Sequence, residues 1–173
     1  MIYKYSVLMC RLEMTTVQHI KNQFVGMERY DGGWQLRDEI EHSACTSHLR
    51  LVSKEDTGIT VIITVTNNKL YSCSLTRAKE GMSPKNAMVL LRPESAAAVA
   101  RMKLEVYKQL CLWDAENACK AAAPQELLMR SVRVAELQRA LDAIDQSDAM
   151  RRMSQRNDTV PYTALPRTQG NLP

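Results

Sequence analysis

Residues 89–113 have the sequence VLLRPESAAAVARMKLEVYKQLCLW and contain the point at which the chain changes its period. Before Pro93, short β-branched segments alternate with turn residues, which is typical of β-strands. After Pro93, apolar residues recur every three or four positions for roughly sixty residues, with one break at Pro124. The sequence therefore predicts an α+β chain, in which an antiparallel β-meander with a covering helix precedes a long helical hairpin.

We expect three segments along the chain: an α+β module at 1–92, a helical hairpin at 93–155 and a flexible tail at 156–173. The tail contains three Pro, one Gly and few large apolar residues. Such a segment cannot bury enough apolar surface to offset the entropy of ordering it, so we expect it to be disordered.

Within the first segment, the pattern predicts a helix from about Thr16 to Val25, opened by Thr15 and Gln18 at capping-box spacing. The turn signal Asp31-Gly32-Gly33 predicts a hairpin between 27–30 and 34–38, while 39–47 is ambiguous and could be a loop. Ser83-Pro84 predicts a short helix at 84–91. Further strands are expected at 2–9, 48–53, 59–66 and 70–77, with Ile59, Val61, Ile63 and Val65 facing the core.

Two long helices are expected after Pro93, one at about 94–122 and one from Pro124 to about Gln155. Because Pro is tolerated at a first helical turn, Pro124 marks the start of the second helix, which should fold back on the first. The first helix has an apolar stripe at Val99, Met102, Val106, Leu110 and Trp113, and the second has a seam at Leu127, Val134, Leu137, Leu141 and Ile144, with Arg130 as the polar exception.

Composition limits the class of protein. The chain is 45% apolar, carries a net charge of +4 and contains ten Met, whose flexible side chains suit adaptable surfaces. Its five Cys are scattered without a CxxC pair, which favours a reducing compartment. No apolar run approaches the ~18 residues that span a bilayer, and no signal-peptide pattern is present, so we expect a cytoplasmic protein without membrane contact.

One local cluster could carry chemistry: His42, Cys45 and His48. These residue types suit zinc, but a structural zinc site needs four ligands and only three are close in sequence. A nucleophilic Cys45 paired with His19, His42 or His48 is a second alternative, although nothing in the sequence indicates a lowered thiol pKa. A small, buried and inert Cys45, flanked by two surface histidines, is the simpler interpretation. Since catalytic and phosphate-binding motifs are absent, we expect no cofactor, no metal and no enzymatic activity.

The helical half gives the main functional expectation. Residues 94–122 are apolar on more than one side, and a helix that is hydrophobic on two faces must bury both. One face can meet the second helix, and the other needs the β module or a second chain. We therefore expect a small binding or regulatory protein that docks to a protein partner and forms a homodimer, with anchors at Leu104, Tyr107, Leu112 and Trp113.

An alternative function is nucleic-acid binding. Arg151, Arg152 and Arg156 form a basic patch near the end of the second helix and could contact phosphates. Cations are also favoured at a helix C-terminus by its dipole, and no aromatic platform accompanies the patch. The identity of a partner, the number of subunits and the purpose of the tail are not determined by these patterns.

Overall fold

The computed structural model describes residues 15–25 and 33–157. The predicted strands at 2–9 and 27–30 and the predicted disorder of 158–173 lie outside these residues. The elements are α1 (Thr16–Phe24), β1 (Trp34–Ser43), β2 (Thr46–Ser53), β3 (Ile59–Thr66), β4 (Lys69–Arg77), β5 (Lys85–Met88), α2 (Ala98–Lys120) and α3 (Pro124–Asn157). The predicted α+β architecture, with a meander, a covering helix and a long helical hairpin, is confirmed.

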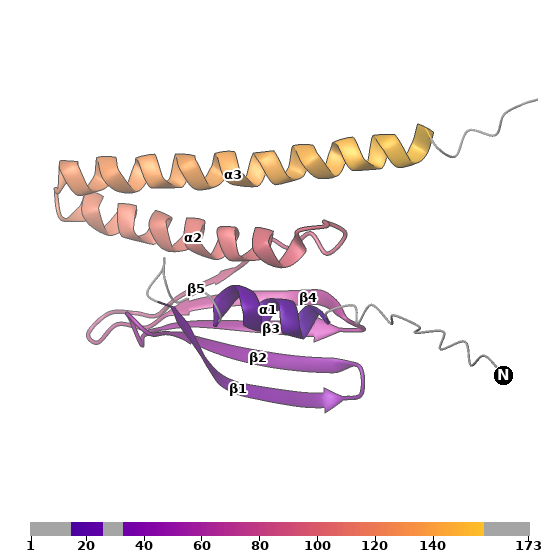
Figure 1. Ribbon diagram of the computed structural model, residues 1–173. Coiled ribbons are helices and arrows are strands. Elements are labelled where there is room, and N and C mark those ends of the chain that lie inside the picture. The colour runs from indigo at the N-terminus through magenta and orange to yellow at the C-terminus, as the bar shows by residue number, and fades with distance from the viewer. Residues whose placement is uncertain (1–14, 26–32, 158–173) are drawn as a thin grey trace, which may run out of the picture.

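The described elements form three layers (Figure 1). The sheet is the lowest layer in this view, α1 and α2 cover one of its faces, and α3 lies along the outer side of α2. Helix α2 thus lies between the sheet and α3, and each of them covers part of its apolar surface.

The sheet is a five-stranded meander in which every strand is antiparallel to the next. The predicted strands at 48–53, 59–66 and 70–77 correspond to β2, β3 and β4. On β3, Ile59, Val61, Ile63 and Val65 are buried as predicted, whereas Ile62 on the opposite face is 41% exposed. The strand period of two thus decides which face of the sheet meets the helices.

The ambiguous segment 39–47 is not a loop. β1 continues to Ser43, and β2 begins at Thr46 after a two-residue turn. Ile40 pairs with His48 across the two strands. Because β1 is an edge strand that is exposed over most of its length, its side chains are largely polar, and the apolar alternation that marks a strand is missing.

The helix predicted at 84–91 is also wrong. Lys85–Met88 forms β5, which pairs with β4 through Leu75 and Ala87. Pro84 is compatible with both structures. Pro has no backbone N–H, and neither the start of an edge strand nor the first turn of a helix requires that donor. The pairing with β4 decides between the two.

Helix α1 forms where the capping signal predicts it. Thr15 Oγ1 accepts a hydrogen bond from Gln18 N at 3.2 Å, and Ile20 and Phe24 are buried against the sheet and α2. Thr16 N donates to Asn68 Oδ1 at 2.6 Å, which ties the start of the helix to the β3–β4 turn. A cap and a turn therefore fix the position of the covering helix.

The core between the sheet and the helices contains the predicted α2 stripe. Val99, Met102, Val106, Leu110 and Trp113 are all buried there. Trp34, at the start of β1, packs edge-on against Phe24 with ring centroids 5.6 Å apart. The buried side chains of this core are mainly aliphatic.

The second helix begins at Pro124 as predicted and reaches Asn157. Ala122, in the connecting turn, has φ = 51°, a conformation that reverses the chain within a few residues. Leu137 and Leu141 of α3 are buried, while the other seam residues, Leu127, Val134 and Ile144, are half-buried. Leu137 and Leu141 lie outside the cluster that joins the sheet, α1 and α2, so α3 has a smaller apolar contact of its own.

Candidate docking surface

The predicted anchors do not share one surface. Trp113 is 6% exposed and packs in the core, so it offers almost no area to a partner. Leu112 is 38% exposed on α2. Leu104 and Tyr107 are half-buried and line one groove. The structure thus brings together two of the four predicted residues.

This groove runs along α2 between α1 and α3 and has a volume of about 370 Å³. Its apolar walls are Leu104, Tyr107 and Cys111 of α2 and Leu137 of α3. Burial raises the pKa of the Cys111 thiol, so this side chain stays protonated and contributes as a small apolar group. The groove is therefore an apolar recess of the size that receives side chains of a ligand.

Hydrogen bonds and ring contacts hold the groove open in one shape. Tyr107 Oη accepts a hydrogen bond from Trp34 Nε1 at 2.9 Å, and the two rings are 6.4 Å apart. Lys103 donates from its ammonium to the carbonyl of Gln23 in α1, and the ammonium lies 5.7 Å from the centroid of the Tyr107 ring. Arg133 of α3 lines the opposite rim. The groove is therefore apolar, with the exposed guanidinium of Arg133 on its α3 side.

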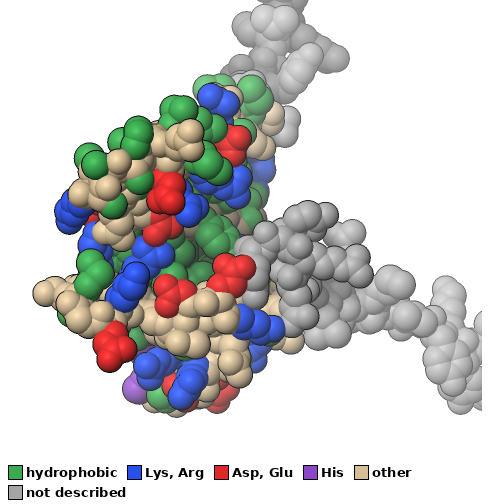
Figure 2. Space-filling view, turned by 90° about the vertical axis from the view of Figure 1, so that its left-hand side faces the viewer, with side chains coloured by type: hydrophobic (Ala, Val, Ile, Leu, Met, Phe, Trp, Pro, Cys, Tyr) green, Lys and Arg blue, Asp and Glu red, His purple; other side chains and the backbone are tan. Residues whose placement is uncertain are grey.

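Apolar side chains are also exposed on α3, where sequence reasoning did not place any. Leu128, Met129 and Val132 are 66%, 71% and 51% exposed, and Met150 and Met153 follow near the other end. Figure 2 views the molecule from the end at which α2 turns into α3 and shows hydrophobic side chains over this helical pair, interspersed with charged ones. The spacing of these residues is visible in the sequence, but it is easily overlooked beside the stronger inward seam.

A belt of charged side chains joins α2 and α3. Arg101, with a side chain 4% exposed, donates from Nε and Nη2 to the two carboxylate oxygens of Asp145 at 2.9 and 3.2 Å. Arg92 Nη1 lies 3.0 Å from the same carboxylate, and Glu105 lies 3.4 Å from Arg101 Nη1. The hydrogen bonds from Arg101 lower the pKa of Asp145. This belt orients α3 on α2 where apolar contact is sparse.

Asp148 fastens the far end of α3 to the start of α2. The Ser95 hydroxyl donates to one carboxylate oxygen, and Ala96 N donates to the other at 3.2 Å. These bonds replace a local cap, because the residue before α2, Ala97, has no capping side chain. The Ser95 hydrogen bond lowers the pKa of Asp148, which stays ionised in this contact. Both ends of α3 are thus tied to α2.

The predicted basic patch lies on the last turns of α3. Arg151 Nη2 is 3.8 Å from Asp148, Arg152 Nη2 is 3.9 Å from Glu94, and their side chains are 46% and 52% exposed. Arg156 is exposed one turn further on. The three arginines are therefore accessible to solvent, and Arg151 and Arg152 each lie near a carboxylate.

The cluster of His42, Cys45 and His48 spans the β1–β2 hairpin. The two imidazole rings are 4.3 Å apart, and His48 Nδ1 is 3.0 Å from the Thr64 hydroxyl. The interpretation of Cys45 as a buried residue is wrong, because Cys45 is exposed in the turn between the two strands. Within 15–25 and 33–157, no group of three His, Cys, Asp or Glu side chains is arranged to hold a metal ion.

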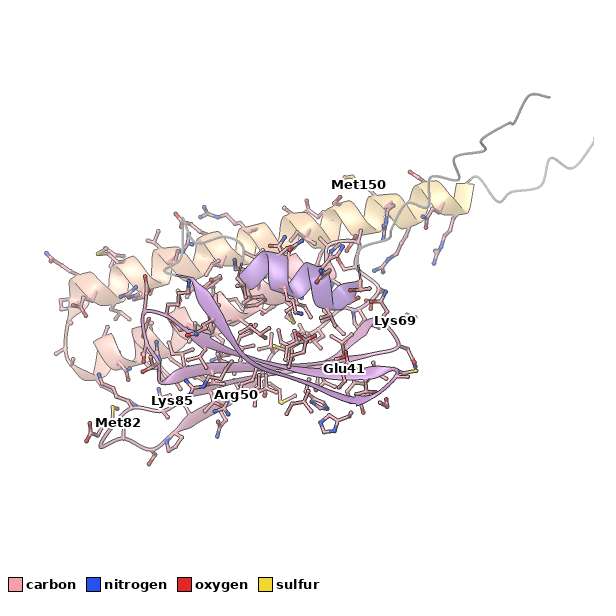
Figure 3. The ribbon with its side chains drawn as sticks, turned by 60° about the horizontal axis from the view of Figure 1, so that its bottom comes forward. Glu41, Arg50, Lys69, Met82, Lys85 and Met150 are labelled. Carbon is pink, nitrogen blue, oxygen red and sulfur yellow. The ribbon has the colours of Figure 1, made fainter. Side chains whose placement is uncertain are left out.

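The uncovered face of the sheet carries both polar and apolar side chains. Ile62 is flanked in register by Arg50 of β2 and Ser74 of β4. Arg50 lies 3.7 Å from Asp38 of β1 and is labelled in Figure 3. Polar side chains thus flank Ile62 within the sheet, and this exposed apolar residue is not part of a continuous apolar row with its two nearest neighbours.

No protein-family model, curated protein or solved structure matches this chain. None of the helices in the described part of the chain is both long and apolar enough to cross a membrane.

Proposed function

We propose that the chain is a small binding or regulatory protein that docks to another protein through its helical half, self-associates and carries out no catalysis. The observation that supports the docking role is the apolar groove lined by Leu104, Tyr107, Cys111 and Leu137. Its shape is fixed by the Trp34–Tyr107 hydrogen bond, so a ligand meets a preorganised site and loses less entropy on binding.

The rims of the groove indicate the chemistry of the partner. Arg133 lines the groove from α3, and its Nη1 is 3.2 Å from an exposed Glu136. Lys103, on the α2 side, is buried and its ammonium is bonded to the Gln23 carbonyl. A segment that inserts leucine-like side chains and carries a carboxylate beside them would fill the apolar recess and meet the guanidinium of Arg133. We therefore propose an amphipathic, acidic segment of a partner protein as the occupant.

A synthetic amphipathic helix with leucine on one face and glutamate on the other is expected to bind the groove. Binding should change the fluorescence of Trp34, which is bonded to the groove wall, and the same peptide with lysine in place of glutamate should bind about tenfold more weakly, equal to about 1.4 kcal/mol. Fluorescence titration measures both affinities.

Two substitutions in α2 test whether the peptide binds in the groove. Leu104→Glu places a carboxylate in the groove and should abolish binding, whereas Leu112→Glu, on the same helix but outside the groove lining, should leave it unchanged. Equal loss in both variants, or equal affinity for the acidic and basic peptides, would contradict the groove as the docking site.

We propose nucleic-acid binding as a second candidate, because Arg151 and Arg152 are half exposed beside Arg156. Three phosphate contacts would weaken binding to a labelled DNA duplex about 40-fold between about 50 and 200 mM salt. The combined change Arg151→Ala and Arg152→Ala should remove most of this dependence in fluorescence anisotropy. Absence of binding at low salt would dismiss this candidate.

A further inference from the structure

The outer side of α3 carries a second periodic stripe, opposite to the seam that contacts α2. Starting at Leu128, the stripe advances in alternating steps of four and three residues, the heptad spacing of helices that pack side by side. All of its members are exposed. They are Leu128, Val132, Ala135, Arg139, Asp142, Gln146, Ala149 and Met153.

This outer stripe faces away from the rest of the molecule. Leu137 and Leu141, which face α2, are 4% and 0% exposed, while Leu128 and Met153 of the stripe are both 66% exposed. Met150, adjacent to the stripe, is labelled in Figure 3, where its side chain points away from α2. No described element covers this side of α3 (Figure 1). The stripe is therefore open along its length, about 39 Å at 1.5 Å per residue.

The stripe is complementary to itself when reversed. Suppose that a second α3 lies antiparallel on it, with the midpoint of the contact between Ala140 and Leu141. Each apolar end of one stripe then packs against the opposite apolar end of the other. Leu128 then faces Met153, Val132 faces Ala149, Ala135 faces Gln146 and Arg139 faces Asp142, and a two-fold axis repeats each layer.

The charged residues at the centre of the stripe favour the antiparallel orientation of the two α3 helices over the parallel one. Arg139 makes no hydrogen bond or ion pair within the described part of the chain, and Asp142 accepts one hydrogen bond, from Gln138 Nε2 at 2.8 Å. In the antiparallel arrangement each Arg139 meets an Asp142 of the other copy, which gives two ion pairs beside the two-fold axis. A parallel arrangement would place Arg139 on Arg139 and Asp142 on Asp142, which like-charge repulsion opposes.

We propose that the outer stripe of α3 binds a second copy of this chain in antiparallel orientation, with Arg139 and Asp142 paired across the interface. A single helix pair is at the low end of interface sizes, below about 1,200 Å², and its central layers are polar. The dimer is therefore concentration-dependent, with a dissociation constant on the order of micromolar. This inference deepens the self-association part of the proposed function and does not depend on the groove.

A charge-exchange experiment tests it on the full chain by sedimentation equilibrium. Arg139→Asp alone and Asp142→Arg alone each place like charges in the central layers and should weaken self-association about tenfold or more. An equimolar mixture of these two variants should form a heterodimer, because each supplies the charge that the other lacks. The combined exchange Arg139→Asp with Asp142→Arg should restore the homodimer.

Both side chains are exposed, so the variants should keep the far-ultraviolet circular dichroism of the unchanged protein. A strictly monomeric protein at hundreds of micromolar, or single variants that dimerise as well as the unchanged chain, would overturn the proposal. Binding of the acidic peptide to the groove should be the same in all four proteins. Loss of the dimer with peptide binding intact, or the reverse, therefore separates this inference from the docking role.

Discussion

Replacing Leu51 with alanine is expected to lower the free energy of unfolding by about 2–5 kcal/mol. Leu51 lies on β2, is 0% exposed and belongs to the cluster that joins the sheet to α1 and α2. Its removal loses transfer free energy and leaves a cavity that a close-packed sheet cannot collapse. Urea unfolding followed by circular dichroism measures the change.

Leu141→Ala is the matched control, because Leu141 is also 0% exposed but lies on α3, outside that cluster. We expect it to loosen α3, which amide hydrogen exchange would detect as faster exchange in 124–157 with the sheet still protected. A loss below about 1 kcal/mol for Leu51→Ala would contradict the assignment of this cluster as the main core.

Replacing Arg101 with alanine is expected to cost about 3 kcal/mol, the lower end of the range for a broken buried ion pair. The change leaves Asp145 and Glu105 without their shared guanidinium in the α2–α3 interface. The upper end is not expected, because Asp145 is 26% exposed and keeps Arg92 as a partner. Urea unfolding at neutral pH measures the loss, which added salt should reduce little because the Arg101 side chain is only 4% exposed.

The combined change Arg101→Leu with Asp145→Leu is the control for this pair. Glu105 keeps Lys108, 3.0 Å away, so no carboxylate is left without a cation. Replacing a buried pair by apolar groups of similar volume is often neutral or stabilising, so the double variant should regain most of the lost stability. A single variant as stable as the unchanged protein would show that the belt does not hold α3 in place.

The spacing of apolar residues was sufficient to predict a helix or strand wherever one face of that element is buried. The alternation in Ile59–Thr66 predicted both the strand and its inward side chains, and the three-four spacing from Val99 to Trp113 predicted the buried stripe of α2. It failed at β5 and in the second half of β1, of which the sequence predicted only 34–38 as a strand. β1 and β5 are largely exposed, so their side chains carry no burial signal, and only backbone pairing with β2 and β4 makes them strands.

The candidate site was predicted less well, since a pattern shows which faces are apolar but not what covers them. Trp113 appeared to be an anchor and is buried, whereas Leu104 and Tyr107 are left in a groove. The outward stripe of α3 has a spacing that the sequence contains, yet its availability depends on which side of α3 packs on α2.

By itself, the sequence determined the change from strands to helices at Pro93, the start of α3 at Pro124, and the inward faces of β3 and α2. These features are local, because they depend on proline geometry and on side chains a few positions apart. Only the tertiary structure decided that α2 lies between the sheet and α3, that Arg101 and Asp145 meet, and which apolar side chains remain exposed. Each of these depends on contacts between distant segments, whose free energy appears only when the layers pack together.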